Sequence, residues 1–157
     1  MRYGPVFYAP VMNRVQLSQH WPDPPLQGVA KYQRLVEICR EHGVSTPEDP
    51  WPRWPGAGPP TVIAPLFLLY DYSFCPAGLS PEEAVRWAAE GGILCADERR
   101  LSPDPHPSRQ AWCQARLAAT VSRLEALPDD TQTVLINHWP LRLDLCRLFR
   151  IPRFTPW

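Results

Sequence analysis

The sequence predicts an α/β fold, because short apolar runs with strand character alternate with longer segments of helical periodicity. The apolar runs cover residues 6–9, 61–70 and 133–136, and the helical segments cover residues 29–41, 80–92 and 108–127. A chain of 157 residues is expected to form one domain. We therefore expect a single α/β domain with three loops that are rich in proline.

The first helix is predicted over residues 29–41, where Val29, Tyr32, Val36 and Cys39 recur at intervals of three and four and Gly43 closes the segment. The apolar run that follows at 61–70 is strand-like along its whole length. Pro65 interrupts it and predicts a bulge or a change of direction.

The later helices carry recognisable start signals. Ser80 can cap a helix that has Pro81 at its first position, and Glu83 completes a capping box. Ser108 can cap the longest helix, in which Ala111, Cys113, Leu117, Val121 and Leu124 line one side. After the strand at 133–136, residues 141–149 predict a further short helix.

The composition excludes several classes of protein. Hydrophobic residues make up 45% and charged residues 20%, which is typical of a globular chain. The 16 basic and 16 acidic residues balance, so neither nucleic acid nor a membrane is an expected partner. The start shows no signal-peptide core, and we expect a cytoplasmic protein. The five cysteines include no Cys-x-x-Cys pair, and Cys39, Cys113 and Cys146 are expected to be buried apolar residues.

The 21 prolines cluster at 22–25, 47–60 and 103–107 and mark the three long loops. The middle loop contains Trp51, Trp54 and a Pro-x-x-Pro segment from Pro52 to Pro55. Such a segment could serve as a polyproline ligand in a protein-interaction module. A rigid loop whose tryptophans pack on the domain is the simpler interpretation.

The most informative segment runs from Val134 to Leu141 and reads Val-Leu-Ile-Asn-His-Trp-Pro-Leu. Its apolar start is short enough to be a buried strand, and Pro140 should end that strand near His138. His138 would then lie at the C-terminal end of a strand, where open α/β sheets usually build their sites. The alternative is a histidine that merely ends a strand and binds a neighbouring loop.

This segment resembles the strand-Asn-His-x-Pro-Leu motif of the calcineurin-like metallophosphoesterases. Much of the chain from about residue 28 onward is similar to one branch of that superfamily. The similar stretches are Gly28–Tyr32, Gly43–Pro50, Ala64–Leu66, Leu69–Phe74, Asp97–Glu98 and Trp112–Cys113. The resemblance implies a two-sheet sandwich flanked by helices, of which this chain would hold a part.

The same resemblance implies hydrolysis of a phosphate ester at a site with two divalent metal ions, which would be Mn, Fe or Zn. His138 matches one metal ligand of the family, and Asn13 is the second residue that could correspond to a ligand. The oligomeric state is left open by the sequence.

Other motifs of the family are missing from this sequence. It contains no Asp-x-His, no Gly-Asp and no Gly-His, and Arg14 stands where the family has a histidine after Asn13. We therefore expect a central part of a phosphoesterase domain that binds metal weakly and is inactive on its own. A gene fragment, a frameshifted reading and a truncated product would each account for this pattern, and a non-catalytic remnant is an alternative to the enzyme.

The remaining polar residues have simpler interpretations. Asp71 could orient a histidine, although an Asp in this setting more often caps the following turn. Asp97 and Glu98 are expected in a solvated loop or at a helix cap. His20 and His106 are expected on exposed loops, and His42 is expected in the last turn of a helix.

Overall fold

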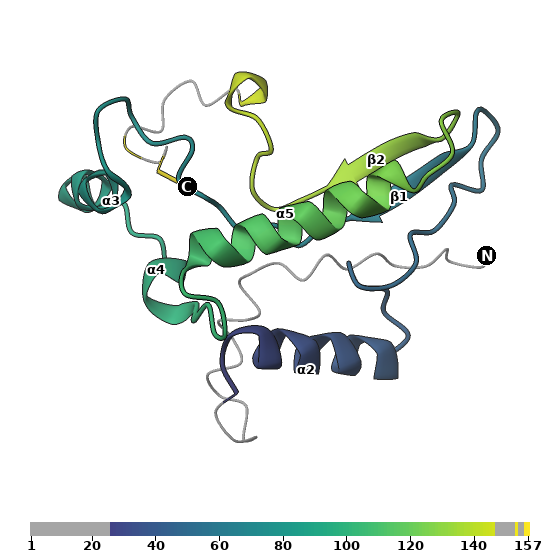
Figure 1. Cartoon of the computed structure of the whole chain (residues 1–157), viewed down its shortest axis with the longest axis horizontal. Helices are drawn as coiled ribbons and strands as arrows, with labels where there is room; N and C mark the ends of the chain where they lie inside the picture. The colour runs from purple at the N-terminus through teal and green to yellow at the C-terminus, as the bar shows by residue number, and fades with distance from the viewer. Residues whose placement is uncertain (1–25, 147–152, 154–155) are drawn as a thin grey trace.

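A parallel pair of strands and the helices around it form a mixed α/β structure (Figure 1). The computed structural model describes residues 26–146, 153, 156 and 157, so the predicted strand at 6–9, the loop at 22–25, Asn13 and His20 lie outside the described residues. The elements are α2 (Gly28–Glu41), β1 (Thr61–Pro65), α3 (Pro81–Glu90), α4 (Asp97–Arg100), α5 (Arg109–Glu125), β2 (Gln132–Ile136) and the 3-10 turn η2 (Leu143–Leu145). None of the helices in these described ranges is long and apolar enough to cross a membrane.

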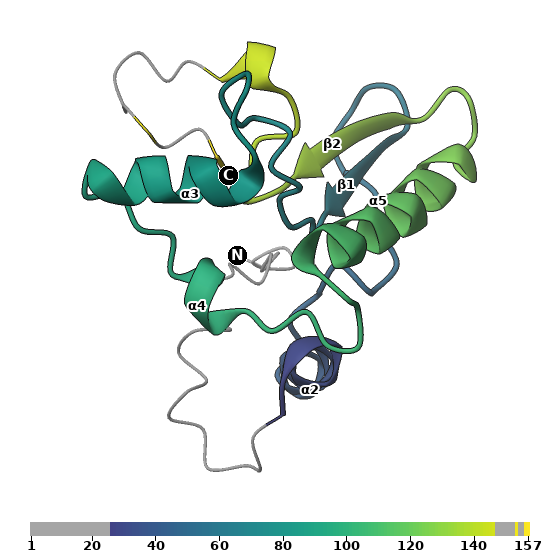
Figure 2. The same cartoon turned by 60° about the vertical axis from the view of Figure 1, so that its left-hand side comes forward.

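The two strands run in the same direction, as Figure 2 shows, with Thr61 opposite Gln132 and Pro65 opposite Ile136. β1 ends at Pro65, so the predicted strand over 61–70 is too long. Pro65 has no N–H to donate, and beyond the Leu66 N–H bond to Ile136 O the buried residues up to 70 are no longer part of a strand. The sequence indicated a bulge or a change of direction at Pro65, and β1 ends at this residue.

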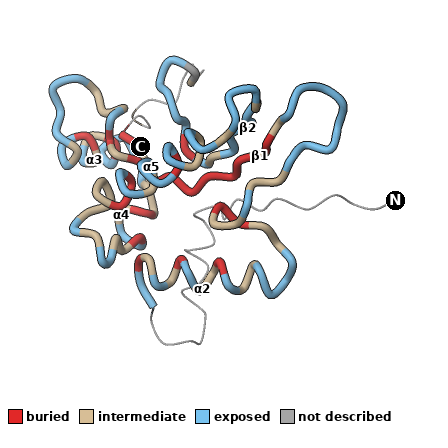
Figure 3. Tube along the Cα trace, turned by 45° about the vertical axis from the view of Figure 1, so that its right-hand side comes forward, coloured by how far each residue is buried: buried red, intermediate tan, exposed pale blue. Residues whose placement is uncertain are grey.

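β2 matches the predicted strand in position, but the prediction that it is buried is wrong. All five of its residues are exposed, and Val134, Leu135 and Ile136 keep 39–45% of their surface accessible (Figure 3). In the described part of the chain, β2 pairs with β1 alone. Strands of parallel sheets are normally covered on both faces, so an exposed apolar strand of this kind is unusual. The apolar run made the strand recognisable without showing what would cover it.

The proline-rich loop at 47–60 contributes to the sheet from the other side. Trp54 N–H donates to Thr61 O at 2.8 Å, and Ile63 N–H donates to Pro52 O at 2.9 Å. Arg53 thereby forms an isolated antiparallel bridge with Val62. Because these backbone groups pair with β1, the Pro52–Pro55 segment is held against the sheet in this conformation instead of standing free for a polyproline-binding partner.

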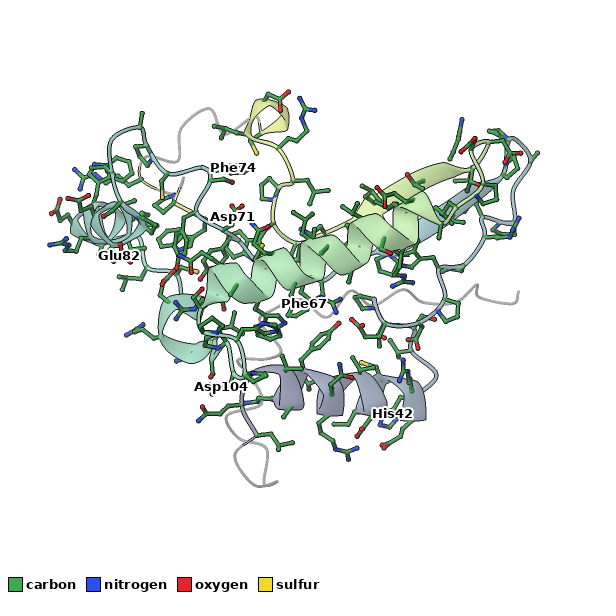
Figure 4. All side chains as sticks on the ribbon, in the orientation of Figure 1. His42, Phe67, Asp71, Phe74, Glu82 and Asp104 are labelled. Carbon is green, nitrogen blue, oxygen red and sulfur yellow. The ribbon has the colours of Figure 1, made fainter. Side chains whose placement is uncertain are left out.

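An aromatic cluster joins α2 to α5 through the segment that follows β1. The Tyr32 and Phe67 rings stack with centroids 4.3 Å apart, and Trp112 contacts both rings edge-on. Phe67 lies between the two helices in Figure 4. The N-terminus of α2 approaches the loop at 103–107 closely at Gly28, where a Cβ atom would lie 2.1 Å from the Asp104 carbonyl oxygen. Only glycine fits that contact.

The inward side of α5 carries arginine as well as aromatic side chains. Leu117 and Val121, which were expected on one apolar side, keep 41% and 39% of their surface exposed. Arg116 instead lies over the Tyr32 and Phe67 rings, and Arg123 lies 4.1 Å from the Trp51 ring centroid. Both arginines therefore pack as planar groups on aromatic faces while their charges reach carbonyl and carboxylate oxygens.

The carboxylate of Glu48 connects this arginine packing to α2. It accepts hydrogen bonds from the Tyr32 hydroxyl and from Arg116, each at 2.6 Å. Arg116 also donates to the Phe67 carbonyl oxygen at 3.0 Å. Burial tends to raise the pKa of Glu48, but these two donors outweigh it and hold the pKa below its usual value. Glu48 thus stays ionised and ties α2 to α5.

The predicted start signals at Ser80 and Ser108 are confirmed. The Ser80 hydroxyl oxygen accepts from Glu83 N–H and the Glu83 carboxylate accepts from Ser80 N–H, which completes the capping box. Ser108 accepts from Ala111 N–H at the start of α5. The predicted helix at 141–149 is corrected by the structure, because among the described residues of that segment only the 3-10 turn η2 forms. Cys113 is buried as expected, whereas Cys39 and Cys146 are half-buried.

Replacing Glu48 by Gln should lower the free energy of unfolding at neutral pH by about 1.5–3 kcal/mol, because the charged partner of Arg116 is lost. A carboxyl group whose pKa is depressed by folding stabilises above its unfolded pKa, near 4.5, and loses that contribution as the pH falls through its folded value. The difference between wild type and Glu48→Gln should therefore shrink toward zero at low pH. Urea unfolding at a series of pH values measures it.

The matched control is Glu125→Gln, which changes an exposed carboxylate on α5. This variant should stay within about 0.5 kcal/mol of wild type at every pH. A Glu48→Gln effect that is equally large at neutral and acidic pH would contradict the assigned role of the ionised carboxylate.

Candidate functional site

The candidate site lies where the two strands end. Leu66 N–H donates to Ile136 O at 2.8 Å, and the chain then continues as residues 66–74 after β1 and residues 137–141 after β2. Because the strands are parallel, both segments leave the sheet at the same edge, which is where α/β sheets place their ligands. His138 therefore lies at a strand end, as predicted, although that strand is exposed.

Asn137 holds the two segments together. Its side-chain oxygen accepts from Leu68 N–H at 3.3 Å, and its amide nitrogen donates to the Trp139 carbonyl oxygen at 2.9 Å. A side-chain amide has both a donor and an acceptor, so one residue can satisfy backbone groups on both sides. The hydrogen bonds that position this loop are therefore made by Asn137.

His138 itself is exposed. Its ring meets the Trp139 ring edge-on, with centroids 5.2 Å apart, and Trp139 in turn contacts the Tyr70 ring at 5.0 Å. Among the described residues, no group of three or more His, Cys, Asp or Glu side chains could hold a metal ion. These residues therefore do not form a complete metal site, and Asn13 lies outside them.

Asp71 and Tyr72 shape the opposite side of the site. The Asp71 carboxylate accepts from Ser73 N–H at 2.9 Å, so Asp71 caps the turn that follows it, which is the simpler of its two interpretations. Tyr72 adopts a left-handed backbone conformation with φ of 62°, which is uncommon for a bulky residue. Such a conformation persists only where the surroundings enforce it, and it is found preferentially at ligand sites.

The hydrogen bonds of Glu98 hold the turn at Tyr72 in place. Its Oε1 atom accepts from the hydroxyls of Tyr70 and Tyr72 at 3.0 and 2.8 Å and from the Trp157 indole at 2.8 Å. Its Oε2 atom accepts from Arg109 at 3.2 Å, and Arg109 also donates to the Glu98 carbonyl oxygen. Asp97 and Glu98 were expected in a solvated loop or at a helix cap. They lie in the first turn of α4, but they are not solvated, since Asp97 is 4% exposed and Glu98 binds four side chains. Sequence spacing gave no sign of these partners, because they come from three distant segments.

The tyrosine hydroxyls keep their protons in this arrangement. Burial raises the pKa of Tyr70 and of Tyr72 well above the usual range, and the hydrogen bond to Glu98 raises the pKa of Tyr72 further. Burial also raises the pKa of the Cys113 thiol to about 11. These groups therefore serve as hydrogen-bond donors or apolar walls and not as acids, bases or nucleophiles near neutral pH.

A cavity of about 110 Å³ lies between the two segments. It is lined by residues 68–74, by Asn137 and residues 139–141, and by Cys113, Leu117 and Trp157. Figure 4 shows Asp71 and Phe74 on the 66–74 segment between β1 and α3. Of the other predicted residues, His42 lies exposed at the end of α2, and His106 is half-buried and stacks on Trp112 with centroids 6.1 Å apart, so it is not freely exposed as expected.

The fold and site define an α/β protein that carries a histidine at a strand end beside an aromatic cavity. No protein-family model matches the chain. It is 43% identical over 157 residues to the [acyl-carrier-protein] phosphodiesterase PptH of Mycobacterium tuberculosis, and the match covers 99% of this chain and 48% of that protein. The chain is therefore homologous to PptH and spans about half of its length.

The crystal structure of the phosphopantetheinyl hydrolase PptH from Mycobacterium tuberculosis shares the same fold over this part. The TM-score is 0.87 at 43% sequence identity, and the match covers 99% of this chain and 55% of that chain. The mixed α/β structure with its small parallel sheet thus corresponds to part of the PptH structure.

Replacing Glu98 by Gln should lower the free energy of unfolding by about 3 kcal/mol or more, because the half-buried Arg109 loses its charged partner. Adding Arg109→Met to that variant should recover part of the loss, since no uncompensated charge is left inside. Chemical denaturation of the two single variants and the double variant measures both effects. Glu82→Gln, an exposed change on α3, is the control. Equal stability of Glu98→Gln and the control would contradict the role of Glu98.

Proposed function

We propose that this chain forms part of a phosphodiesterase that hydrolyses the ester between a phosphopantetheinyl group and an acyl carrier protein. The observation that carries the proposal is the 43% identity to PptH over almost the whole chain, together with the matching fold. The activity in the name of that relative belongs to a protein about twice as long as this chain. The proposal therefore concerns an enzyme in which this chain works with further polypeptide.

The resemblance of the Asn137–His138 segment to calcineurin-like metallophosphoesterases supports the same reaction class. We propose a two-sheet sandwich and a dinuclear centre of Mn, Fe or Zn for the complete enzyme, in which His138 supplies one ligand. The exposed imidazole at the strand end is accessible for that role. The other ligands would come from outside the described residues, since these contain no chelating group of three. The chain alone is proposed to be inactive, and the cytoplasmic location stays a prediction.

A chimera tests the proposal. The half of PptH that matches this chain is replaced by this chain, and release of phosphopantetheine from a holo-acyl carrier protein is measured with added Mn. We expect turnover in the chimera. His138→Ala should reduce it by orders of magnitude, because losing a ligand disturbs both the metal affinity and the activation of water. Metal content is measured in parallel.

The matched control is His42→Ala, which removes another exposed histidine at the end of α2. It should leave turnover within about two-fold of the unsubstituted chimera, as expected for a surface change. A folded chimera that releases no phosphopantetheine would contradict the proposed substrate. Full activity and full metal content in His138→Ala would contradict the role of His138.

A further inference from the structure

The cavity beside His138 has a chemical character that points to one part of a substrate. Its walls are mainly aromatic and aliphatic and include Tyr70, Phe74, Trp139 and Leu141. None of the described residues that line it is lysine, arginine or histidine, and Asp71 adds a carboxylate. A phosphate group would therefore meet no cation there and would face a negative charge. The cavity suits an uncharged group with apolar surface.

One residue of the wall, Trp139, carries a buried hydrogen-bond donor that is unpaired among the described residues. Trp139 is 9% exposed, and its buried indole N–H has no hydrogen-bond partner in the part of the chain that the structure describes. A buried donor that lacks an acceptor costs about 1–3 kcal/mol, so a ligand that brings an acceptor to it gains affinity. The cavity thus combines a mainly apolar lining with a residue, Trp139, whose indole N–H lacks an acceptor. An apolar lining with few polar groups is typical of small-molecule sites.

The position of the cavity indicates which part of the proposed substrate it would bind. Asn137 and residues 139–141 line it, so it borders the chain on both sides of His138. In a phosphopantetheinyl ester the first group after the phosphate is the pantoyl unit, which carries two methyl groups, a hydroxyl and an amide carbonyl. With the phosphate at His138, the methyl groups would meet the aromatic walls, and the hydroxyl or carbonyl oxygen would offer the acceptor that Trp139 lacks.

We infer that this cavity is a binding site for the dimethyl pantoyl end of the phosphopantetheinyl group. The inference rests on the proposed function for the choice of ligand. It goes beyond that function by assigning Trp139, Leu141 and the Tyr72 turn to recognition of the uncharged arm. The enforced conformation of Tyr72 and its bond to Glu98 would keep this wall in place before the ligand arrives.

Two fragments of the arm serve as probes for the chain itself. Panthenol carries the pantoyl end without phosphate or carboxylate, and N-acetylcysteamine carries the thiol end. Each is titrated into ¹⁵N-labelled protein, and the indole resonance of Trp139, assigned with Trp139→Phe, is followed. Panthenol should shift this resonance with saturation, whereas N-acetylcysteamine at the same concentration should leave it unchanged.

Two exposed leucines of one segment give matched variants. Leu141 lines the cavity and is 45% exposed, whereas Leu143 is 51% exposed and does not line it. Both tolerate a polar group without unfolding the chain, as expected for exposed positions. Leu141→Gln should weaken panthenol binding about five-fold or more through lost apolar contact. Leu143→Gln should leave the dissociation constant within about two-fold, as expected for a surface change.

The inference is overturned if panthenol does not shift the Trp139 resonance, if N-acetylcysteamine shifts it equally, or if the two leucine variants bind panthenol alike. Because the titration needs neither metal nor turnover, its result is independent of the hydrolysis assay. Specific panthenol binding with an inactive chimera would support the site and contradict the hydrolase. An active chimera without panthenol binding would contradict the site and leave the hydrolase in place.

Discussion

The parallel pairing of β1 with β2 joins two segments that lie far apart in the sequence. Leu68 and Asn137, which share a hydrogen bond just beyond the strand ends, are separated by 69 residues. The register that sets Pro65 opposite Ile136 determines which residues follow each strand at the common edge. A register shifted by one residue would turn every strand side chain to the other face and would move Asn137 away from Leu68. The cavity and the position of His138 both depend on this pairing.

Polar side chains with several partners then fix the segments around the sheet. Glu48 connects α2 to α5 through Tyr32 and Arg116, and Glu98 connects the Tyr70–Tyr72 turn to Arg109 and Trp157. Each carboxylate is partly buried and paired with an arginine, so its removal leaves a charge without compensation. Together the two networks cross-link the helices with the segments that follow the strands.

Local signals in the sequence predicted the elements well. The capping box at Ser80, the Ser108 cap and the periodicity over 29–41 each depend on residues within a few positions of one another. The short apolar run at 133–136 also marked a strand correctly. What could not be predicted depends on distant partners. The four side chains around Glu98 come from three separate segments, and the exposure of β2 depends on which neighbours it has.

In the candidate site, too, local features could be predicted from the sequence and contacts between distant residues could not. The position of His138 at a strand end followed from a short apolar run and a proline, which are local features. The double role of Asn137 required the location of Leu68, and the cavity required the Tyr72 turn together with Trp139 and Trp157. The resemblance to metallophosphoesterases indicated a reaction class, and the likeness to PptH narrowed the substrate that is proposed.

Amide hydrogen exchange at Leu66 and Leu68 tests the central claim most directly. Leu66 N–H donates to Ile136 O, and Leu68 N–H donates to the side chain of Asn137. If the parallel pairing holds the two segments together, both amides should exchange far more slowly than an unstructured peptide. Protection at Leu68 should fall selectively in Asn137→Ala, while Leu66 stays protected. Exchange of both amides at the unstructured rate in wild type would contradict the pairing and the site built on it.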